Sequence, residues 1–393
     1  APKLADHLSQ NPSVLDSVLD PGFFDKPPSA DILHQELNTV LQRSEFVEDT
    51  LDLTRRWAHD HWFQIGVQLL RGHQGPEAAA RALSNIAECS VDLMHSKMFD
   101  EFCRAHGTVK NAEMIILALG KLGGREMTPT SDLDMIFIYS VPSAVKSSDG
   151  PKPLSLAQYF ARLSQRVINS ISAQTSEGRL FEVDMRLRPS GNAGPIASSL
   201  QAFTQYHNEL SWTWEHMAMT RARVISGPPK LRKHVQKIIT DVLTRPRDLN
   251  KLLADVASMR NRINDKRHTE NFLSVKHLRG GLVDIEFISQ FLQLKYANKH
   301  PSILSANTKT ALENLMSQKL LSDADGKVLI GALGLLQNIQ ILMRLTIDEG
   351  AEKEQDHEIP NGLQEDLAKV GQVNNFTTLL KKIATTANAV LEI

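Results

Sequence analysis

The residues ALGKLGGREMTPTSDLDMIFIYS, at 118–140, combine apolar runs with glycines and polar turn residues. An apolar run at 114–119 leads into a glycine-rich segment, and a second apolar run occupies 133–138. Apolar runs bounded by glycines and polar turn residues are typical of strands joined by a loop. The sequence therefore predicts a strand, a glycine-rich loop and a second strand.

Two aspartates, Asp132 and Asp134, lie at the start of the second predicted strand with one leucine between them. Successive side chains in a strand point to opposite faces, so we expect both carboxylates on one face and Leu133 on the other. Adjacent carboxylates repel unless a cation lies between them, and Mg²⁺ binds one or two carboxylates together with substrate phosphates. For an arbitrary motif of this kind, a surface strand with two solvated aspartates is the more frequent explanation.

A second segment, GRLFEVDMRLRPSGNAGP at 178–195, supplies the deciding pattern. Strand alternation would place the charged residues of this segment on one face, namely Glu182, Asp184, Arg186 and Arg188. A third carboxylate, on a strand beside the first pair, is what nucleotidyl transfer with two Mg²⁺ ions requires. Arginines on the same face would neutralise charge on the phosphates, while ion pairs with Glu182 or Asp184 are the alternative role for them.

Composition and charge are those of an ordinary globular protein. Hydrophobic residues make up 41% and charged residues 23%, and 44 basic against 45 acidic residues give a formal net charge of −1. No overall positive field is available to hold nucleic acid or an anionic membrane, so neither is expected as a partner. The two cysteines, Cys89 and Cys103, lie far apart without a CxxC pattern, which favours a cytoplasmic location and argues against structural zinc.

Three regions follow from the spacing of apolar residues. Helical spacing predicts a helical leader at 1–105, strand-like runs place a sheet-bearing domain at 106–228, and helical spacing returns in a carboxy-terminal bundle at 229–393. A helix is expected at 156–173. The most apolar run, 328–336, is too short for a membrane span and predicts a buried helix. The fold class is therefore α+β and predominantly helical.

Several segments together resemble one family. They are GKLGGREMTPTSDLDMIFIY, YFARLSQRVINSISAQTSEGRLFEVDMRLRPSGNAGP, WTWEHMAMTRARVISG and GGLVDIEFISQFLQLKY. The family is the bacterial bifunctional glutamine synthetase adenylyltransferase/adenylyl-removing enzymes, in the polymerase-β-like nucleotidyltransferase superfamily, and the resemblance extends over 4–296. It implies a polymerase-β-like domain, a small mixed sheet with helices, between helical regions. Members carry two related halves, so one set of motifs implies a half, and RPSGNAGP and SWTWEHMAMTRARV look like the carboxy-terminal, adenylylating half.

The resemblance also implies roles for individual residues. It makes Asp132, Asp134 and Asp184 the catalytic ligands of two Mg²⁺ ions, with ATP as the substrate. The residues implied in nucleotide binding are Gly123, Gly124 and Ser131 of the loop, with Lys121, Arg186 and Arg188 as further candidates. Lys121 is equally well explained as a solvated residue. Gly120 and the pair at 123–124 both fit the superfamily pattern, so the glycine that touches phosphate stays open.

Three functions remain as hypotheses. The first is Mg²⁺-dependent transfer of AMP from ATP to a tyrosine hydroxyl of glutamine synthetase, which releases pyrophosphate. The second uses the same site for phosphorolytic removal of AMP. The third is a binding module with a vestigial site that engages a regulator such as the PII signalling protein, and the three intact aspartates disfavour it. Glutamine synthetase and PII are the expected partners.

Overall fold

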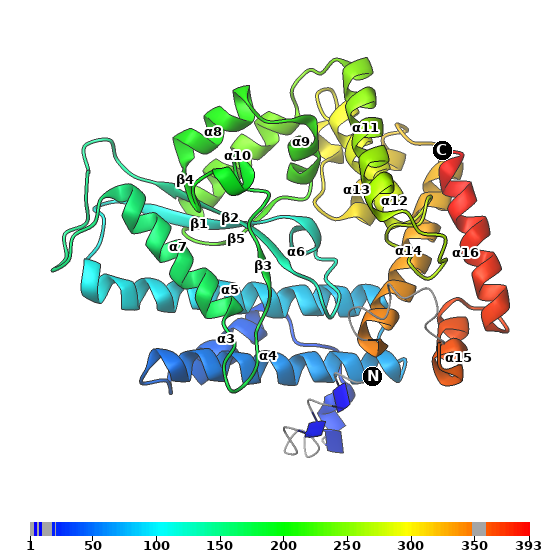
Figure 1. Cartoon of the computed structure of the whole chain (residues 1–393), viewed down its shortest axis with the longest axis horizontal. Coiled ribbons are helices and arrows are strands. Elements are labelled where there is room, and N and C mark those ends of the chain that lie inside the picture. The colour runs from blue at the N-terminus through cyan, green and yellow to red at the C-terminus, as the bar shows by residue number, and fades with distance from the viewer. Residues whose placement is uncertain (1–3, 6–7, 10–17, 20, 348–358) are drawn as a thin grey trace.

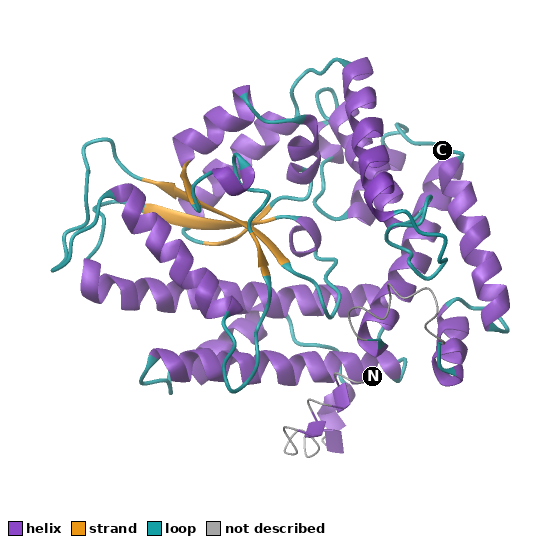
Figure 2. Ribbon diagram, in the orientation of Figure 1, coloured by secondary structure: helices purple, strands orange, loops and turns teal. Residues whose placement is uncertain are grey.

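The computed structural model describes residues 4–5, 8–9, 18–19, 21–347 and 359–393. Helices predominate, and one small mixed sheet lies among them (Figures 1 and 2). The predicted α+β, mainly helical class is confirmed. The predicted leader falls partly outside the described residues, at 1–3, 6–7, 10–17 and 20.

The leader is a layer of long helices. Its elements are η1 (Pro21–Phe24), α3 (Ala30–Leu41), α4 (Val47–Leu70) and α5 (Pro76–His106). Leu33, Leu37 and Leu41 recur at the i, i+4 spacing that lines one helix face, and all three are buried against α5. Proline in its first turn begins α5, and Gly107 at φ 69° ends it, because glycine enters this left-handed region without a Cβ clash.

The sheet consists of β1 (Glu113–Ala118), β2 (Leu133–Ser140), β3 (Val183–Asp184), β4 (Ala197–Ser199) and β5 (Arg223–Ser226). Its order is β3-β2-β1-β5, and β4 also pairs with β2. The β1–β2 and β1–β5 pairs are antiparallel, whereas β3 and β4 run parallel to β2. The short helix α6 (Gly120–Gly124) connects β1 to β2, so the glycine-rich segment predicted as a loop is one helical turn.

Helices cover both faces of the sheet (Figure 2). They are α7 (Leu156–Ser172), α8 (Leu200–Glu209), α9 (Thr213–Met219) and α10 (Pro229–Leu243), with a 3₁₀ turn η2 (Gly191–Ala193). Met135 and Phe137 belong to the core shared with the leader and α7, while Ile136 and Ile138 belong to the core shared with α8–α10. This alternation is what a strand buried on both faces requires. The helix predicted at 156–173 is confirmed as α7.

The carboxy-terminal region is a helical bundle beside the sheet domain (Figure 1). Its elements are α11 (Leu249–Arg267), α12 (Leu282–Tyr296), η3 (Pro301–Ile303), α13 (Thr308–Ser317), α14 (Asp323–Thr346), α15 (Asn361–Val370) and α16 (Phe376–Leu391). Among the helices described, α14 alone is long and apolar enough to cross a membrane. Leu329, Leu333 and Leu336 of α14 lie in the bundle core, so the buried helix predicted at 328–336 is confirmed.

The predicted region boundaries fall near the end of α5 and between β5 and α10. Contacts cross both boundaries, since α14 of the bundle packs on α5 and α12 packs on α9. The division into 1–105, 106–228 and 229–393 stays a prediction about folding units.

Arg55 on α4 joins the leader to the loop that precedes β3. Its side chain is fully buried and donates hydrogen bonds to four backbone carbonyls, those of Gly178 at 3.0 Å, Ser170 at 3.0 Å, Ala173 at 2.7 Å and Leu51 at 3.0 Å. A buried guanidinium without such acceptors would cost several kcal/mol, on the order of what is found for other unpaired buried charges. Arg55 therefore holds the 173–178 loop against α4.

Candidate active site

The three predicted aspartates come together at the ends of two neighbouring strands. Asp132 precedes β2 and is exposed, Asp134 lies within β2, and Asp184 ends β3. In the parallel β2–β3 pair, Asp134 and Asp184 are register partners. Leu133 is fully buried in the core on the opposite face, so the predicted alternation holds in β2. The carboxylates thus lie on one face of the sheet, at the edge formed by β2 and β3.

Asp134 is the carboxylate most affected by its neighbours. Burial, then the charges of Asp184 and Asp132, raise the pKa of Asp134 to about 6. Arg221 and Lys276 act in the opposite direction, which places both cations near it. Desolvation and like charges each disfavour an ionised carboxylate, and a bound cation relieves both effects. The donor set therefore fits a hard divalent ion.

Asp184 is held by Arg186 in this structure. The Arg186 Nε donates to the two carboxylate oxygens at 3.0 and 2.8 Å, and its backbone N–H donates at 2.8 Å. Burial alone would raise the pKa of Asp184, but the hydrogen bonds from Arg186 and the charges of Arg186 and Arg188 hold it below its usual value. Within the described part of the chain, no three histidine, cysteine, aspartate or glutamate side chains are grouped to hold a metal ion. Metal ligation by the three aspartates stays a prediction.

The predicted strand alternation beyond Asp184 is wrong. β3 ends at Asp184, and the backbone then turns, so Arg186 and Arg188 are not successive residues on a strand face. The Arg188 guanidinium donates to the carbonyl oxygens of Met185 at 2.7 Å, Gly194 at 3.3 Å and Asn192 at 3.4 Å. Arg188 therefore closes the turn that presents Arg186. Phosphate binding by either arginine stays a prediction.

The glycines of α6 have different neighbours. Gly120, at φ 54°, approaches the Asp134 carboxylate so closely that a Cβ there would lie 2.1 Å from Oδ2. A Cβ on Gly123 would lie 1.9 Å from the Arg221 carbonyl oxygen, and one on Gly124 would lie 2.7 Å from an Arg221 guanidinium nitrogen. Gly120 is thus the glycine beside the carboxylates, whereas Gly123 and Gly124 allow α6 to pack on Arg221. Phosphate contact by Gly123 and Gly124 stays a prediction.

Lys121 and Ser131 are placed in structural contacts. The Lys121 ammonium donates to the Gln340 side chain of α14, and burial, followed by the charges of Arg344 and Lys276, lowers its pKa to about 7. The Ser131 hydroxyl accepts the backbone N–H of Thr128 at 2.9 Å and stabilises the turn before Asp132. The predicted phosphate contacts of Lys121 and Ser131 stay predictions.

A group of cations from the carboxy-terminal region was not found by the sequence analysis. Burial lowers the pKa of Lys276, in the loop before α12, and the charges of Glu286, Arg344 and Asp134 also shift it, which places these groups near Lys276. Arg344 of α14 donates to the Thr130 hydroxyl at 3.0 Å in the turn before Asp132. Neither residue belongs to a spaced motif, so no local pattern could have indicated them.

A buried ion network lies behind this cation group. Arg221 donates to Glu126 at 2.7 Å and lies 3.0 Å from Glu286 of α12, and Glu126 also accepts the backbone N–H of Thr308 at 2.7 Å. The Arg221 and Glu126 side chains are only 6% and 7% exposed. The network connects the sheet domain to the bundle, and Arg221 also lies near enough to lower the pKa of Asp134.

Comparisons with known proteins agree with this architecture. A family model for glutamate-ammonia ligase adenylyltransferase matches residues 1–238, and one for GlnD PII-uridylyltransferase matches residues 251–393. Proteins named bifunctional glutamine synthetase adenylyltransferase/adenylyl-removing enzyme are similar along the chain. The one from Rhodopseudomonas palustris strain TIE-1 is 41% identical over 99% of the chain. Those from Xanthobacter autotrophicus and Bradyrhizobium diazoefficiens are 39% and 37% identical over 98% and 99%. The chain spans 39% of the length of each of these relatives.

Proposed function

The chain belongs to the glutamate-ammonia ligase adenylyltransferase family, and from this membership we propose that it transfers AMP from ATP to a tyrosine hydroxyl of glutamine synthetase. Pyrophosphate is the second product. The observation that carries the proposal is the register pairing of Asp134 with Asp184, beside Asp132, with the pKa of Asp134 raised by burial and then by both neighbours.

Asp132, Asp134 and Asp184 would hold the two Mg²⁺ ions. When bound, the ions would neutralise the triphosphate and favour the ionised form of the attacking hydroxyl. Asp184 has a lowered pKa and is ionised at neutral pH, so it can accept the tyrosine proton once Arg186 releases it. The exposed Arg186 side chain, 72% accessible, is free to turn from Asp184 toward a phosphate.

The cation group has a matching role in this proposal. Lys276 and Arg344 lie on the bundle side of the aspartates and would bind the β- and γ-phosphates of ATP. The tyrosine oxygen attacks the α-phosphorus, the bond from that phosphorus to the bridging oxygen breaks, and pyrophosphate leaves with the electron pair of that bond. Fixed cations beside the leaving group stabilise the charge that develops on it.

Partners and location follow the same proposal. We propose glutamine synthetase as the acceptor, because it appears in the names of the relatives, and PII as a regulator, because the 251–393 region matches a family named for PII. A cytoplasmic location is consistent with the two unpaired cysteines, Cys89 and Cys103.

The direction of the reaction is the point to test, since the relatives are named for both addition and removal of AMP. The chain is incubated with Mg²⁺, α-labelled ATP and unmodified glutamine synthetase, and label on the acceptor is measured. In parallel, ADP release from adenylylated glutamine synthetase is measured after phosphate is added. Label transfer without phosphate-dependent ADP release supports the proposal. ADP release without transfer would assign the chain to AMP removal, and activity in neither assay would reject both.

A further inference from the structure

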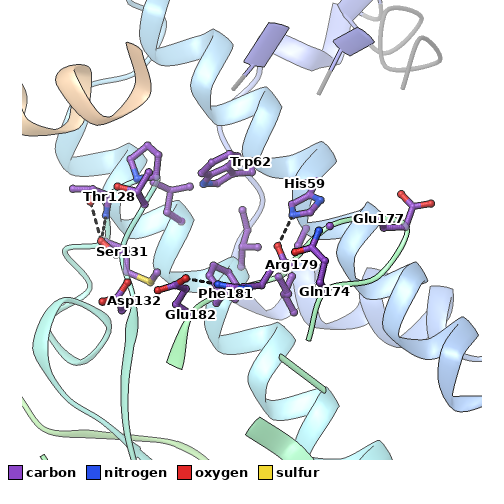
Figure 3. A pocket seen from close by; sticks show the side chains of 18 of the residues that line it. His59, Trp62, Thr128, Ser131, Asp132, Gln174, Glu177, Arg179, Phe181 and Glu182 are labelled. Atoms are coloured by element: carbon purple, nitrogen blue, oxygen red, sulfur yellow. Dashed lines mark hydrogen bonds and ion pairs between the residues drawn. The ribbon is translucent and has the colours of Figure 1, made fainter. Parts of the chain in front are cut away.

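A cavity of about 720 Å³ lies next to the carboxylates, between the leader and the sheet domain. One wall comes from the leader and includes His59 and Trp62 of α4 (Figure 3). The opposite wall consists of two loops, 127–132 before β2 and 174–182 before β3. These loops lead into the strands that carry Asp134 and Asp184. The cavity and the candidate active site are therefore built on the same two segments.

The lining combines aromatic and apolar surface with acidic groups. Trp62 and Phe181 provide ring faces, and the charged groups at the rim include Asp132, Glu177 and Glu182 (Figure 3). Among the lining residues that the structure describes, Arg179 is the single basic residue of the lysine or arginine type, and it is paired with Glu182. Such a site is unfavourable for a triphosphate, because the carboxylates would repel it. It suits an aromatic group on a neutral or basic segment.

The 127–132 loop separates this cavity from the cation group. Thr130 lines the cavity and also accepts the hydrogen bond from Arg344, which is not itself a lining residue. Groups of opposite charge thus lie on the two sides of the 127–132 loop, the cations on the side of the bundle and the carboxylates of the cavity on the side of the leader. In a transfer reaction the attacking group approaches phosphorus on one side while the leaving group departs on the opposite side, so the two need separate subsites.

We propose that this cavity is the acceptor subsite, which receives the tyrosine-bearing segment of the acceptor protein with its ring against Trp62 and Phe181. The inference rests on the proposed function and extends it, because it names the surface that selects the acceptor. Asp132, which lines the cavity, is where the tyrosine hydroxyl meets the catalytic carboxylates. A pocket of this size, within the ~300–1,000 Å³ range of ligand sites, holds an aromatic side chain with neighbouring peptide groups.

Two substitutions in the full chain test the subsite by steady-state kinetics. Trp62→Ala removes an aromatic contact, and Gln174→Trp adds bulk at the exposed cavity rim without removing buried packing. Both substitutions are expected to raise the KM for glutamine synthetase by about tenfold or more, the first because an aromatic anchor is lost and the second because the added ring blocks the cavity. The KM for ATP is expected to stay within about twofold of wild type. Phe99→Ala, which truncates an exposed α5 residue outside the cavity lining, is the control. An increase confined to the KM for ATP would show that the cavity holds the adenine instead, and unchanged constants for both substrates would also overturn the proposal.

A crosslinking experiment gives an answer that does not depend on turnover. Benzoylphenylalanine is introduced at Gln174, or at Phe99 as the control, and the chain is irradiated with purified glutamine synthetase. A crosslink from position 174 to a tyrosine-containing peptide is the expected result. Absence of that crosslink would overturn the subsite even in an enzyme that transfers AMP. Conversely, a chain that crosslinks but does not transfer label would retain the subsite while the proposed reaction fails.

Discussion

Asp134 of β2 and Asp184 of β3 are paired residue for residue across two parallel strands, and only Asp184 has an arginine bound to it. The strands of a sheet lie ~4.8 Å apart, so the two carboxylates are close neighbours. The negative charge of Asp184 is balanced by a bound guanidinium, and that of Asp134 is not. Burial, and then the charges of Asp184 and Asp132, raise the pKa of Asp134, whereas at Asp184 the hydrogen bonds from Arg186 outweigh burial and lower the pKa.

The Asp134→Asn variant is expected to lose transfer activity and gain stability. The raised pKa means that the ionised carboxylate is disfavoured in the folded state, so at pH 7 its removal is expected to stabilise the metal-free protein by up to about 3 kcal/mol. Activity is measured by label transfer, and the free energy of unfolding by urea denaturation with chelator present. Asp241→Asn, at an exposed position on α10, serves as the control. Wild-type activity in Asp134→Asn would contradict the metal assignment.

Arg186→Ala is expected to lower kcat with little effect on folding. The Arg186 side chain is 72% exposed, although that of Asp184 is 14% exposed, so loss of this pair is expected to cost about 1 kcal/mol, the upper end for surface ion pairs. If Arg186 turns to a phosphate during transfer, its loss lowers kcat by ~10²-fold. Steady-state kinetics and thermal unfolding are measured on the same preparation. A variant with unchanged kcat would reduce Arg186 to an ion-pair partner of Asp184.

Arg188→Ala is expected to lower both activity and stability. Arg188 is 9% exposed and its guanidinium donates to three carbonyls of the turn after β3, so truncation leaves part-buried acceptors unpaired at a cost of about 1–3 kcal/mol. Comparison with Arg186→Ala by urea denaturation separates the two roles. Equal stability in the two variants would show that the turn does not depend on Arg188.

Arg221→Met is expected to be among the most destabilising single changes in the chain. It leaves Glu126 buried without its cation, and breaking a buried ion pair costs about 3–5 kcal/mol. Glu126→Gln, which retains an acceptor for the Thr308 N–H, is expected to cost less. Arg104→Met, at a site 77% exposed, is the control. Unfolding free energies within 1 kcal/mol of wild type for Arg221→Met would contradict this interpretation.

His95 is expected to contribute to loss of stability in acid. Burial lowers its pKa to about 4, although Asp92 opposes the shift and Arg232 adds to it, and its Nδ1 lies 2.7 Å from the Ser226 hydroxyl. A neutral imidazole is therefore favoured in the folded state. Its contribution is present above pH 6.5 and is lost as pH falls from 6.5 to 4, by about 3 kcal/mol in total. His95→Gln should lose less stability than wild type between pH 7 and pH 4.5.

The matching control for this measurement is His268→Gln, whose imidazole is 59% exposed. That variant should follow the wild-type pH curve. Identical curves for His95→Gln and wild type would mean that other buried groups account for the acid sensitivity.

Local patterns were sufficient for much of the fold and for the aspartates. Alternation predicts that Leu133 and Asp134 point to opposite faces, and spacing predicts α7 and the buried part of α14, because each depends only on neighbouring residues. The aspartates were found because a strand repeats every two residues. Asp134 and Asp184 become neighbours only through the parallel pairing of β2 with β3, and no local sequence pattern predicts that pairing.

The errors and omissions have a common physical cause. Strand alternation predicts one face for Asp184, Arg186 and Arg188, but hydrogen bonds from the Arg188 guanidinium to nearby backbone carbonyls favour a turn there. Lys276 and Arg344 come from regions more than 130 residues after the first aspartates in sequence, so only the docking of the bundle brings Lys276 near Asp134 and Arg344 to the turn before Asp132. Lys121 belongs to the predicted loop, yet the same docking buries it against Gln340.

The carbonyl contacts of Arg55 also have a consequence for the order of folding events. Arg55 binds groups 115 to 123 positions later in the chain, so these bonds can form only after a long segment has closed, and contacts of high sequence separation form slowly. The helices of the leader need no such closure. During refolding, helix formation should therefore precede the locking of the loop before β3, and recovery of catalytic activity should lag behind recovery of the far-ultraviolet circular dichroism signal.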